Sequence, residues 1–405
     1  MAATLTLAGG SVTAGRSCPL DYQLPADSFS DEPLFDCQTL YVVGGLYGNR
    51  QAMTALERRL AAEPGARVVF NGDMHWFDVD PAVFADIEER VAAHTLLRGN
   101  VETELGRPDD NTAGCGCAYP DEVDDGTVER SNAIHRQLCA SMMHLPGMAE
   151  RLASRPATAV VSVAGRRVAI THGDERSLAG WSCSRSALAD PQREQALHAW
   201  AAANRVSVLA TSHTCAPAAL YLEDTAQGKE LAVPGLAAPG LAVPGLAAIN
   251  NGAAGMPNFN NGRYGLITRI ATRAHPSAIY RAQLPGLVVE ALTLNYDHDA
   301  FLAEFDRQWP ADSPAARSYR ARILQGTSDA PPLPCSAVSV RARPCVHCQR
   351  WIELRPSAAG IATGAVLDVV VDLLGGLLQG FGLLEGQAGH AEQLYRYVAG
   401  LRAHL

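Results

Sequence analysis

The feature that most constrains this chain is a series of short apolar runs that each end in a small, polar turn. Residues 39–44 (TLYVVG), 67–71 (RVVFN) and 95–98 (TLLR) have this form, and residues 50–62 and 81–93 between them have helical spacing. Strands that alternate with helices predict a parallel sheet with helices packed on it. The first third of the chain is therefore expected to be α/β.

The later part of the chain has a different pattern. Residues 157–163 and 167–171 read as a hairpin, and residues 191–204 and 206–211 as a helix and a strand. Further strands follow without helices between them, at residues 218–222, 263–272, 278–281 and 287–295. The sheets should therefore be mixed. We expect two such sheets packed face to face and covered by helices.

The 405 residues are best explained by one large core with two extensions. The core spans residues 38–325, after an irregular leader at 1–37 and before a partly helical C-terminal extension at 326–405. Within the core, residues 231–248 repeat a Pro-Gly pair at five-residue spacing, which predicts a surface loop. Residues 360–384 are long and apolar but contain Asp368 and Asp372, which favours a helical appendage over a membrane span.

Charge and cysteine content limit the partners and the compartment. The formal net charge of −9 argues against general binding to nucleic acid, which needs a basic face. It does not argue against a small phosphorylated substrate, because one metal ion reverses the local charge of a site. Ten cysteines and no basic, apolar leader at the N-terminus indicate a reducing cytoplasm. The oligomeric state is left open.

Potential ligands follow several of the expected strands. The turns read GGLYGN at 44–49, GDMHWFD at 72–78, RGNVETE at 98–104, THGDE at 171–175, SHTC at 212–215 and NNGAAG at 250–255. Strand ends at the carboxyl edge of a sheet share one crevice. The Asp, Asn and His residues in these turns are therefore expected to converge, and a mixed O/N set suits Mn, Fe or Zn better than Ca or Mg.

In their order, these turns resemble the motifs of the calcineurin-like metallophosphoesterases. That family reads D-x-H, G-D, G-N-H, H and G-H-x-H on the strand ends of a four-layer αββα sandwich. The similarity covers about residues 39–295, and Tyr47–Gly48–Asn49 and Asn251–Gly252 are closest to the small bacterial phosphodiesterase-like branch. The resemblance implies the same fold and a two-metal phosphoesterase site.

Carried over residue by residue, the resemblance implies one complete metal site. Its ligands would be Asp73, Asn100, His172 and His213. The other site would use positions 45, 47, 73 and 215, where this chain has Gly45, Tyr47, Asp73 and Cys215. One ion is therefore expected. Whether Tyr47, Cys215 or the nearby His75 completes a second site remains open.

Several further residues are weaker candidates. Val101 stands where the family has its proton donor, so Glu102 is considered for acid/base work. Asp174 and Glu175 could orient His172, and Asn49 and Asn251 are candidates for substrate binding. Cys115 and Cys117 lie in an acidic loop, where they would cap the cleft, bind metal, form a redox bridge or have no role. Cys345 and Cys348 form a CxxC pair that suggests a structural zinc.

Three functional hypotheses follow from these residues. The first is a metal-dependent hydrolase of phosphoric esters, either monoesters or diesters, that uses a metal-activated water. The second is a catalytically impaired relative of the same fold that serves as a metal- or ligand-binding or regulatory module. The third is that a site modified by Tyr47 and Cys215 supports chemistry other than simple hydrolysis.

Overall fold

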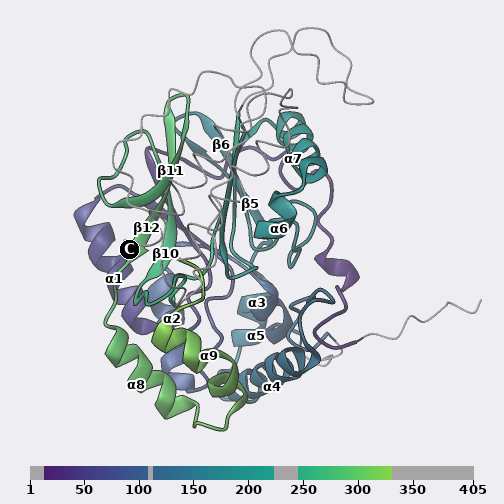
Figure 1. The fold of residues 1–405 in the computed structure, drawn as a ribbon, viewed down its shortest axis with the longest axis vertical. Helices are drawn as coiled ribbons and strands as arrows, with labels where there is room; N and C mark the ends of the chain where they lie inside the picture. Colours follow the sequence, from purple (N-terminus) through teal and green to yellow (C-terminus); the bar gives the residue numbers. More distant parts are fainter. Residues whose placement is uncertain (1–12, 108–112, 223–244, 331–405) are drawn as a thin grey trace, which may run out of the picture. The chain divides into compact units, whose positions relative to one another are not determined.

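The computed structural model describes residues 13–107, 113–222 and 245–330, all of which belong to one compact unit. Two six-stranded sheets lie face to face, with helices on their outer surfaces (Figure 1). The expected four-layer αββα sandwich of two mixed sheets is confirmed.

The first sheet has the strand order β11-β12-β10-β2-β3-β4. Its strands are β2 (Thr39–Val43), β3 (Arg67–Asn71), β4 (Thr95–Leu97), β10 (Gly265–Ala271), β11 (Ala278–Leu284) and β12 (Leu287–Leu294). Strands β2, β3 and β4 are parallel, as their strand–helix alternation predicts. The pairs β2/β10, β10/β12 and β11/β12 are antiparallel. For β10, β11 and β12 this is expected, because no helix lies between them in the chain.

The second sheet has the order β1-β5-β6-β7-β9-β8. Its strands are β1 (Asp36–Cys37), β5 (Thr158–Val163), β6 (Arg166–Thr171), β7 (Val206–Thr211), β8 (Pro217–Leu222) and β9 (Leu246–Asn251). The predicted hairpin is present as the antiparallel pair β5/β6. The prediction of a loop throughout 231–248 was wrong at its end, because β9 pairs parallel with β7. Past the last Pro-Gly pair, residues 246–251 lack proline and are free to pair.

Helices connect and cover the strands. They are α1 (Arg50–Ala62), α2 (Pro81–Val91), α3 (Asn100–Leu105), α4 (Asp125–Met142), α5 (Met148–Ala153), α6 (Arg185–Leu188), α7 (Pro191–Asn204), α8 (His298–Gln308), α9 (Pro314–Gln325) and the 3-10 turn η1 (Leu20–Tyr22). Helices α2 and α7 begin at a proline behind an aspartate, Asp80 or Asp190, whose side chain accepts a backbone N–H. Such caps stabilise the first helical turn.

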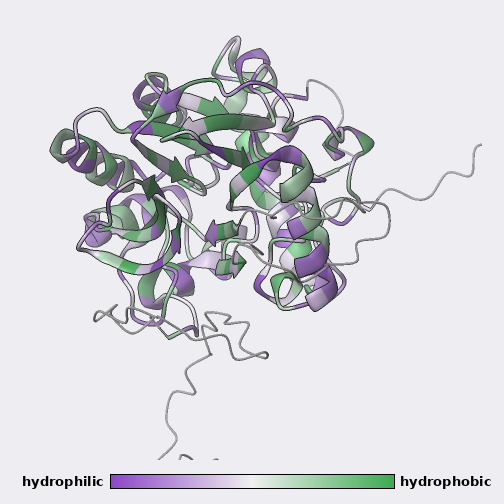
Figure 2. Ribbon diagram, turned by 90° about the horizontal axis from the view of Figure 1, so that it is seen from above, coloured by the Kyte–Doolittle hydropathy of each residue, from purple (hydrophilic) through white to green (hydrophobic). Residues whose placement is uncertain are grey.

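Alternating side chains along the strands build three apolar layers. In β2, Leu40 and Val42 pack between the sheets, whereas Tyr41 and Val43 pack under the helices that include α1 and α2. In β7 of the second sheet, Leu209 packs on the outer face of that sheet, against α7. Figure 2 shows hydrophobic residues concentrated in the strands. Because both faces of each sheet are covered, the strands are nearly continuous apolar runs.

Parts of the leader are integrated into this core. Strand β1 pairs parallel with β5, and Tyr22 and Phe29 are buried. No helix within the described residues is long and apolar enough to cross a membrane. The apolar run at 360–384, the Cys345/Cys348 pair and most of the C-terminal extension lie outside the described residues, as do residues 231–244 of the repeat segment.

Candidate functional site

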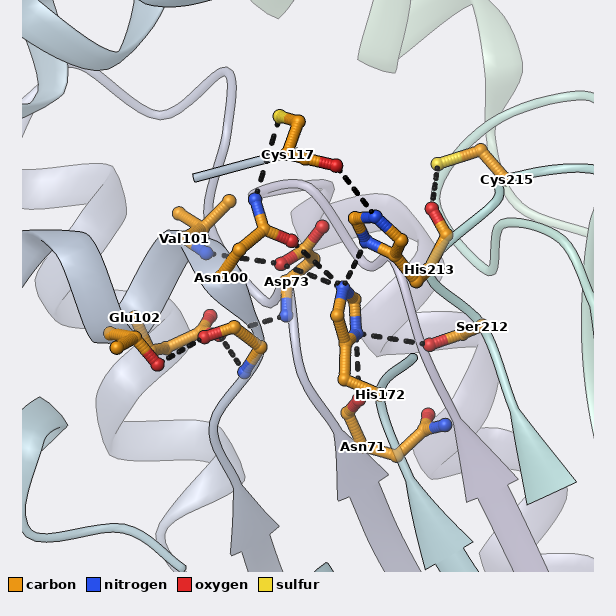
Figure 3. Close-up of polar contacts among 12 residues, drawn as sticks. Asn71, Asp73, Asn100, Val101, Glu102, Cys117, His172, Ser212, His213 and Cys215 are labelled. Atoms are coloured by element: carbon orange, nitrogen blue, oxygen red, sulfur yellow. Dashed lines mark hydrogen bonds and ion pairs between the residues drawn. The ribbon is translucent and has the colours of Figure 1, made fainter. Parts of the chain in front are cut away.

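The four residues expected to share a metal come together at the carboxyl ends of strands from both sheets. Asp73 follows β3, and Asn100 follows β4 as the first residue of α3. His172 follows β6, and His213 follows β7. All four side chains are buried, and they turn toward one another (Figure 3).

Their contacts centre on one ring nitrogen. His172 Nε2 lies 3.0 Å from Asn100 Oδ1, 3.0 Å from His213 Nδ1 and 3.4 Å from Asp73 Oδ1. Donor atoms that share one metal ion at about 2.1 Å are themselves separated by about 3.0–3.4 Å. The observed separations therefore fit ligands of a common cation.

The outer hydrogen bonds determine which atoms face the cluster. His172 Nδ1 is 3.0 Å from the Asn71 carbonyl, and His213 Nε2 is 3.0 Å from the Cys117 carbonyl. A carbonyl can only accept, so each of these nitrogens carries the hydrogen, and His172 Nε2 and His213 Nδ1 present lone pairs. Asn100 Nδ2 donates to the Cys115 carbonyl at 2.9 Å, which turns Oδ1 inward. When both rings are neutral, His172 Nε2, His213 Nδ1, Asn100 Oδ1 and the Asp73 carboxylate all present lone pairs to one another.

The pKa values show that positive charge is favoured beside Asp73. Burial disfavours the imidazolium form of His172, but the Asp73 carboxylate outweighs this and raises its pKa. Burial by itself raises the pKa of Asp73, yet His172 and His213 together with the Val101 N–H leave it lowered. Burial and the adjacent His172 lower the pKa of His213 to about 3, so this ring is a neutral acceptor at pH 7.

Within the ranges described, no group of three or more His, Cys, Asp and Glu side chains qualifies as a metal site. The cluster at His172 brings three such side chains together with the amide of Asn100. Each of these side chains is oriented by a further hydrogen bond or charge, as ligands of a cation would be.

Glycines allow the strand ends to approach this closely. A Cβ on Gly72 would lie 2.6 Å from the Gly99 backbone and 2.7 Å from His172 Nδ1, and the φ angle of Gly72 is +102°. A Cβ on Gly99 would lie 2.5 Å from Asp73 Oδ1. The glycines of the G-D and G-N turns are thus required sterically beside the two oxygen ligands.

Glu102 has a different role from the one considered for it. Its carboxylate accepts the backbone N–H groups of Asp73, Met74 and Gly99 at 2.9, 2.8 and 2.8 Å. Both oxygens are used and the side chain is fully buried. Glu102 therefore ties the turn after β3 to the turn after β4, and it is not placed to give a proton to a substrate.

His75 is also not part of the cluster. Its Nδ1 contacts Asp78 at 2.6 Å and its Nε2 contacts Glu88 at 2.9 Å, while the ring stacks on Phe84. Arg155 completes this buried network by donating twice to Glu88. Because both ring nitrogens are engaged by carboxylates, the hypothesis that His75 is a metal ligand is not supported.

The two substrate-binding candidates are structural. Asn49 caps α1 by accepting from Ala52 N, and it donates to the Gly255 carbonyl. Asn251 donates to the Thr268 hydroxyl and accepts from Tyr280 at 3.0 Å. All of these contacts are buried, so neither side chain is available to a substrate.

Asp174 and Glu175 do not orient His172. Asp174 accepts three backbone N–H groups of its own loop, from residues 176, 177 and 182. Glu175 forms a bidentate pair with Arg193 at 2.6 Å. The orienting partners of His172 are instead the Asn71 carbonyl and the Ser212 hydroxyl at 3.3 Å.

The loop that contains Cys115 and Cys117 supports the site through its backbone. Its two carbonyls hold Asn100 and His213, and the Cys117 carbonyl also accepts from Trp181 Nε1 at 3.0 Å. Both thiols are free and buried, so they form no disulfide. Contacts made by backbone carbonyls cannot be predicted from residue type. The signal in the sequence was the pair Gly114 and Gly116, whose φ angles of +63° and +64° allow the loop to turn its carbonyls toward the site.

The remaining positions carried over from the resemblance lie beside Asp73. The Tyr47 hydroxyl is 2.6 Å from Cys215 Sγ. Burial raises the pKa of both side chains, and their mutual proximity raises that of Tyr47 further, so both are neutral at pH 7. Arg322 of α9, which sequence analysis did not identify, donates to the Cys215 carbonyl at 2.8 Å.

Comparison with known proteins returns matches only among solved structures. No family model and no curated protein matches the chain. A hypothetical protein from Pyrococcus horikoshii is 13% identical, with a TM-score of 0.47 over 71% of this chain and 98% of its own. A metallophosphoesterase from Sphaerobacter thermophilus is 14% identical, with a TM-score of 0.43 over 72% and 100%.

A calcineurin-like phosphoesterase from Bacillus subtilis is also similar, at 6% identity and a TM-score of 0.27 over 67% of this chain and 95% of its own. Two of these three structures are named as a metallophosphoesterase and a calcineurin-like phosphoesterase. This is the family that the motifs resemble. At such identities an activity does not follow from the match, so the function is argued from the side chains.

Proposed function

We propose that this protein is a metal-dependent hydrolase of phosphoric esters, acting on monoesters or diesters. The observation that carries the proposal is the convergence of Asn100 Oδ1, His213 Nδ1 and Asp73 Oδ1 on His172 Nε2. When bound there, a transition metal such as Mn, Fe or Zn would polarise a phosphoryl oxygen and lower the pKa of water.

The protein contributes a rigid frame for this chemistry. The Asn71 and Cys117 carbonyls keep the two imidazoles in the ligating tautomer, and Glu102 holds the turns that contain Asp73 and Asn100. A site whose ligands are oriented before binding loses little free energy to reorganisation. The negative charge of the buried Asp73 carboxylate favours a cation.

The site lacks the side chain that would protonate a leaving oxygen at the position used by the family. Val101 is aliphatic, and both oxygens of Glu102 are occupied by backbone N–H groups. Esters whose leaving group has a low pKa need no proton. We therefore expect aryl esters such as p-nitrophenyl phosphate and bis(p-nitrophenyl) phosphate to be hydrolysed faster than alkyl esters, with a steep dependence on leaving-group pKa.

The test combines metal analysis with a panel of aryl and alkyl phosphomonoesters and phosphodiesters. His172→Ala should remove metal binding and turnover together, whereas His144→Ala, at an exposed position on the turn after α4, should change neither. Protein that contains no metal after reconstitution, or turnover that survives His172→Ala, would refute the proposal.

A second candidate function is a non-catalytic binding or regulatory module that retains the metal. The observation that favours it is the absence of a proton donor at 101, together with Tyr47 and Cys215 at positions that are ligands in the family. In that case the metal would bind tightly while every ester in the panel remains intact. The free thiols of the described residues agree with the proposed cytoplasmic location.

A further inference from the structure

The backbone around Asp73 has an unusual shared geometry. Gly45, Tyr47, Asp73 and Cys215 have φ angles of +61°, +55°, +54° and +53°. Non-glycine residues in this region carry backbone strain, and such residues concentrate at functional sites. These positions correspond to the second cation site of the family that the motifs resemble. The four residues share a left-handed backbone conformation, although three of the four side chains differ from the family's ligands.

The ring of Tyr47 occupies the space of a side chain at position 45. A Cβ built on Gly45 would lie 2.8 Å from both Cζ and the hydroxyl oxygen of Tyr47, and 2.9 Å from Cε2. Real Cβ atoms do not approach other atoms this closely. A carboxylate at position 45 and the present Tyr47 ring therefore exclude one another.

The hydrogen bonds on this side of Asp73 are complete without a cation. The Cys215 thiol donates to the His213 carbonyl at 3.3 Å, which leaves its sulfur to accept from the Tyr47 hydroxyl at 2.6 Å. Each hydrogen thus has an acceptor. This contrasts with the cluster at His172, where Asn100 Oδ1, His213 Nδ1 and Asp73 Oδ1 all approach one ring nitrogen.

Arg322 adds a positive charge next to the same pair. Its guanidinium donates to the Cys215 carbonyl at 2.8 Å and to the Pro257 carbonyl at 3.1 Å. No Asp or Glu within the described residues forms an ion pair with it. A fixed, uncompensated cation at this place repels a second metal ion.

We propose that this protein binds one metal ion per chain, at Asp73, Asn100, His172 and His213, and that Tyr47, Cys215 and Arg322 close the second cation position. The inference rests on the proposed function for its first metal site. It limits the proposed function to a one-metal site, in which Arg322 replaces part of the charge that the family's second cation supplies.

The test is the metal stoichiometry of the full chain, reconstituted with Mn²⁺ and dialysed, then measured by elemental analysis and electron paramagnetic resonance. One ion per chain with the spectrum of an isolated Mn²⁺ supports the inference. Two ions per chain with exchange coupling overturn it and leave the proposed function intact. Absence of metal overturns both. Because stoichiometry is independent of turnover, an inactive protein with one ion supports this inference while refuting hydrolysis.

Variants show whether these side chains are responsible. The combined substitutions Gly45→Asp, Tyr47→His, Cys215→His and Arg322→Gln should raise the stoichiometry from one to two. Tyr47→Phe is the matched control, since it keeps the ring and should remain at one. A folded quadruple variant that still binds one ion would overturn the assignment of Tyr47, Cys215 and Arg322. If the quadruple variant does not fold, the wild type and Tyr47→Phe still decide the stoichiometry.

Discussion

Glu102 offers the most direct test of how this site is built. Its carboxylate accepts three buried backbone N–H groups, from Asp73 and Gly99 at one oxygen and from Met74 at the other. Glu102→Gln keeps the shape of the side chain but replaces one acceptor by an NH₂ group. The amide oxygen can keep the hydrogen bonds from the N–H groups of Asp73 and Gly99. The new NH₂ group then faces the N–H of Met74.

The expected cost follows from these contacts. One charge-assisted hydrogen bond is lost and a buried donor is left without an acceptor, while the other two bonds become neutral. Hydrogen bonds to charged groups contribute about 1.5–3 kcal/mol, and an unsatisfied buried donor costs about 1–3 kcal/mol. These terms overlap, so we expect Glu102→Gln to lower the free energy of unfolding by about 2–4 kcal/mol.

The measurement is urea unfolding of the metal-free protein in a chelator, so that a change in metal affinity does not contribute to stability. Glu129→Gln, at an exposed position of α4, is the control and should change stability by less than about 0.5 kcal/mol. Metal affinity measured separately should fall about 10–100-fold, because the turns that hold Asp73 and Asn100 are no longer tied together. If Glu102→Gln is as stable as Glu129→Gln, Glu102 does not clamp the two turns.

Three further predictions concern residues around this core. Gly116→Ala should weaken metal binding about 10-fold or more, because the φ of +64° at this position disfavours alanine and the loop that holds the Cys117 carbonyl would shift. Cys117→Ser should change metal affinity only a few-fold, because the main contact of Cys117 with His213 is through its carbonyl. Isothermal titration with the metal compares the two variants. The Arg269 guanidinium holds the pKa of Glu63 at about 2, against 4.5 ordinarily, so its stabilisation is present above pH 4.5 and is lost as the pH falls toward 2. Between pH 5 and 2 the free energy of unfolding of the wild type should therefore fall by about 1–2 kcal/mol more than that of Glu63→Gln. This value is reduced because Glu63 is partly exposed. Asn251→Ala should lower the midpoint of thermal unfolding but leave the KM for p-nitrophenyl phosphate unchanged, because Asn251 contacts the buried Thr268 and Tyr280 side chains. A changed KM would indicate that Asn251 contacts the substrate.

The sequence by itself predicted most of the strands, the parallel order of β2, β3 and β4, the hairpin β5/β6 and the positions of the four converging residues. These follow from local rules: apolar runs of strand length, the helices between them, and Gly, Asn, Asp and His at strand ends. The turn at Gly72–Asp73 could be placed in this way because a parallel strand and its following turn are contiguous in the chain. The end of the repeat segment was misassigned, since pairing of β9 with β7 depends on a neighbour distant in sequence.

Only the tertiary structure decided what each polar side chain does. His172 meets Asn100 across 72 positions of sequence, and the Cys117 carbonyl meets His213 across 96. Glu102, Asn49 and Asn251 have residue types suited to a site, yet buried backbone and side-chain groups use all of their principal contacts. A buried polar group must find a partner, and that partner is set by packing. Residue type therefore predicted the four residues that converge, whereas packing separated them from the residues that hold them in place.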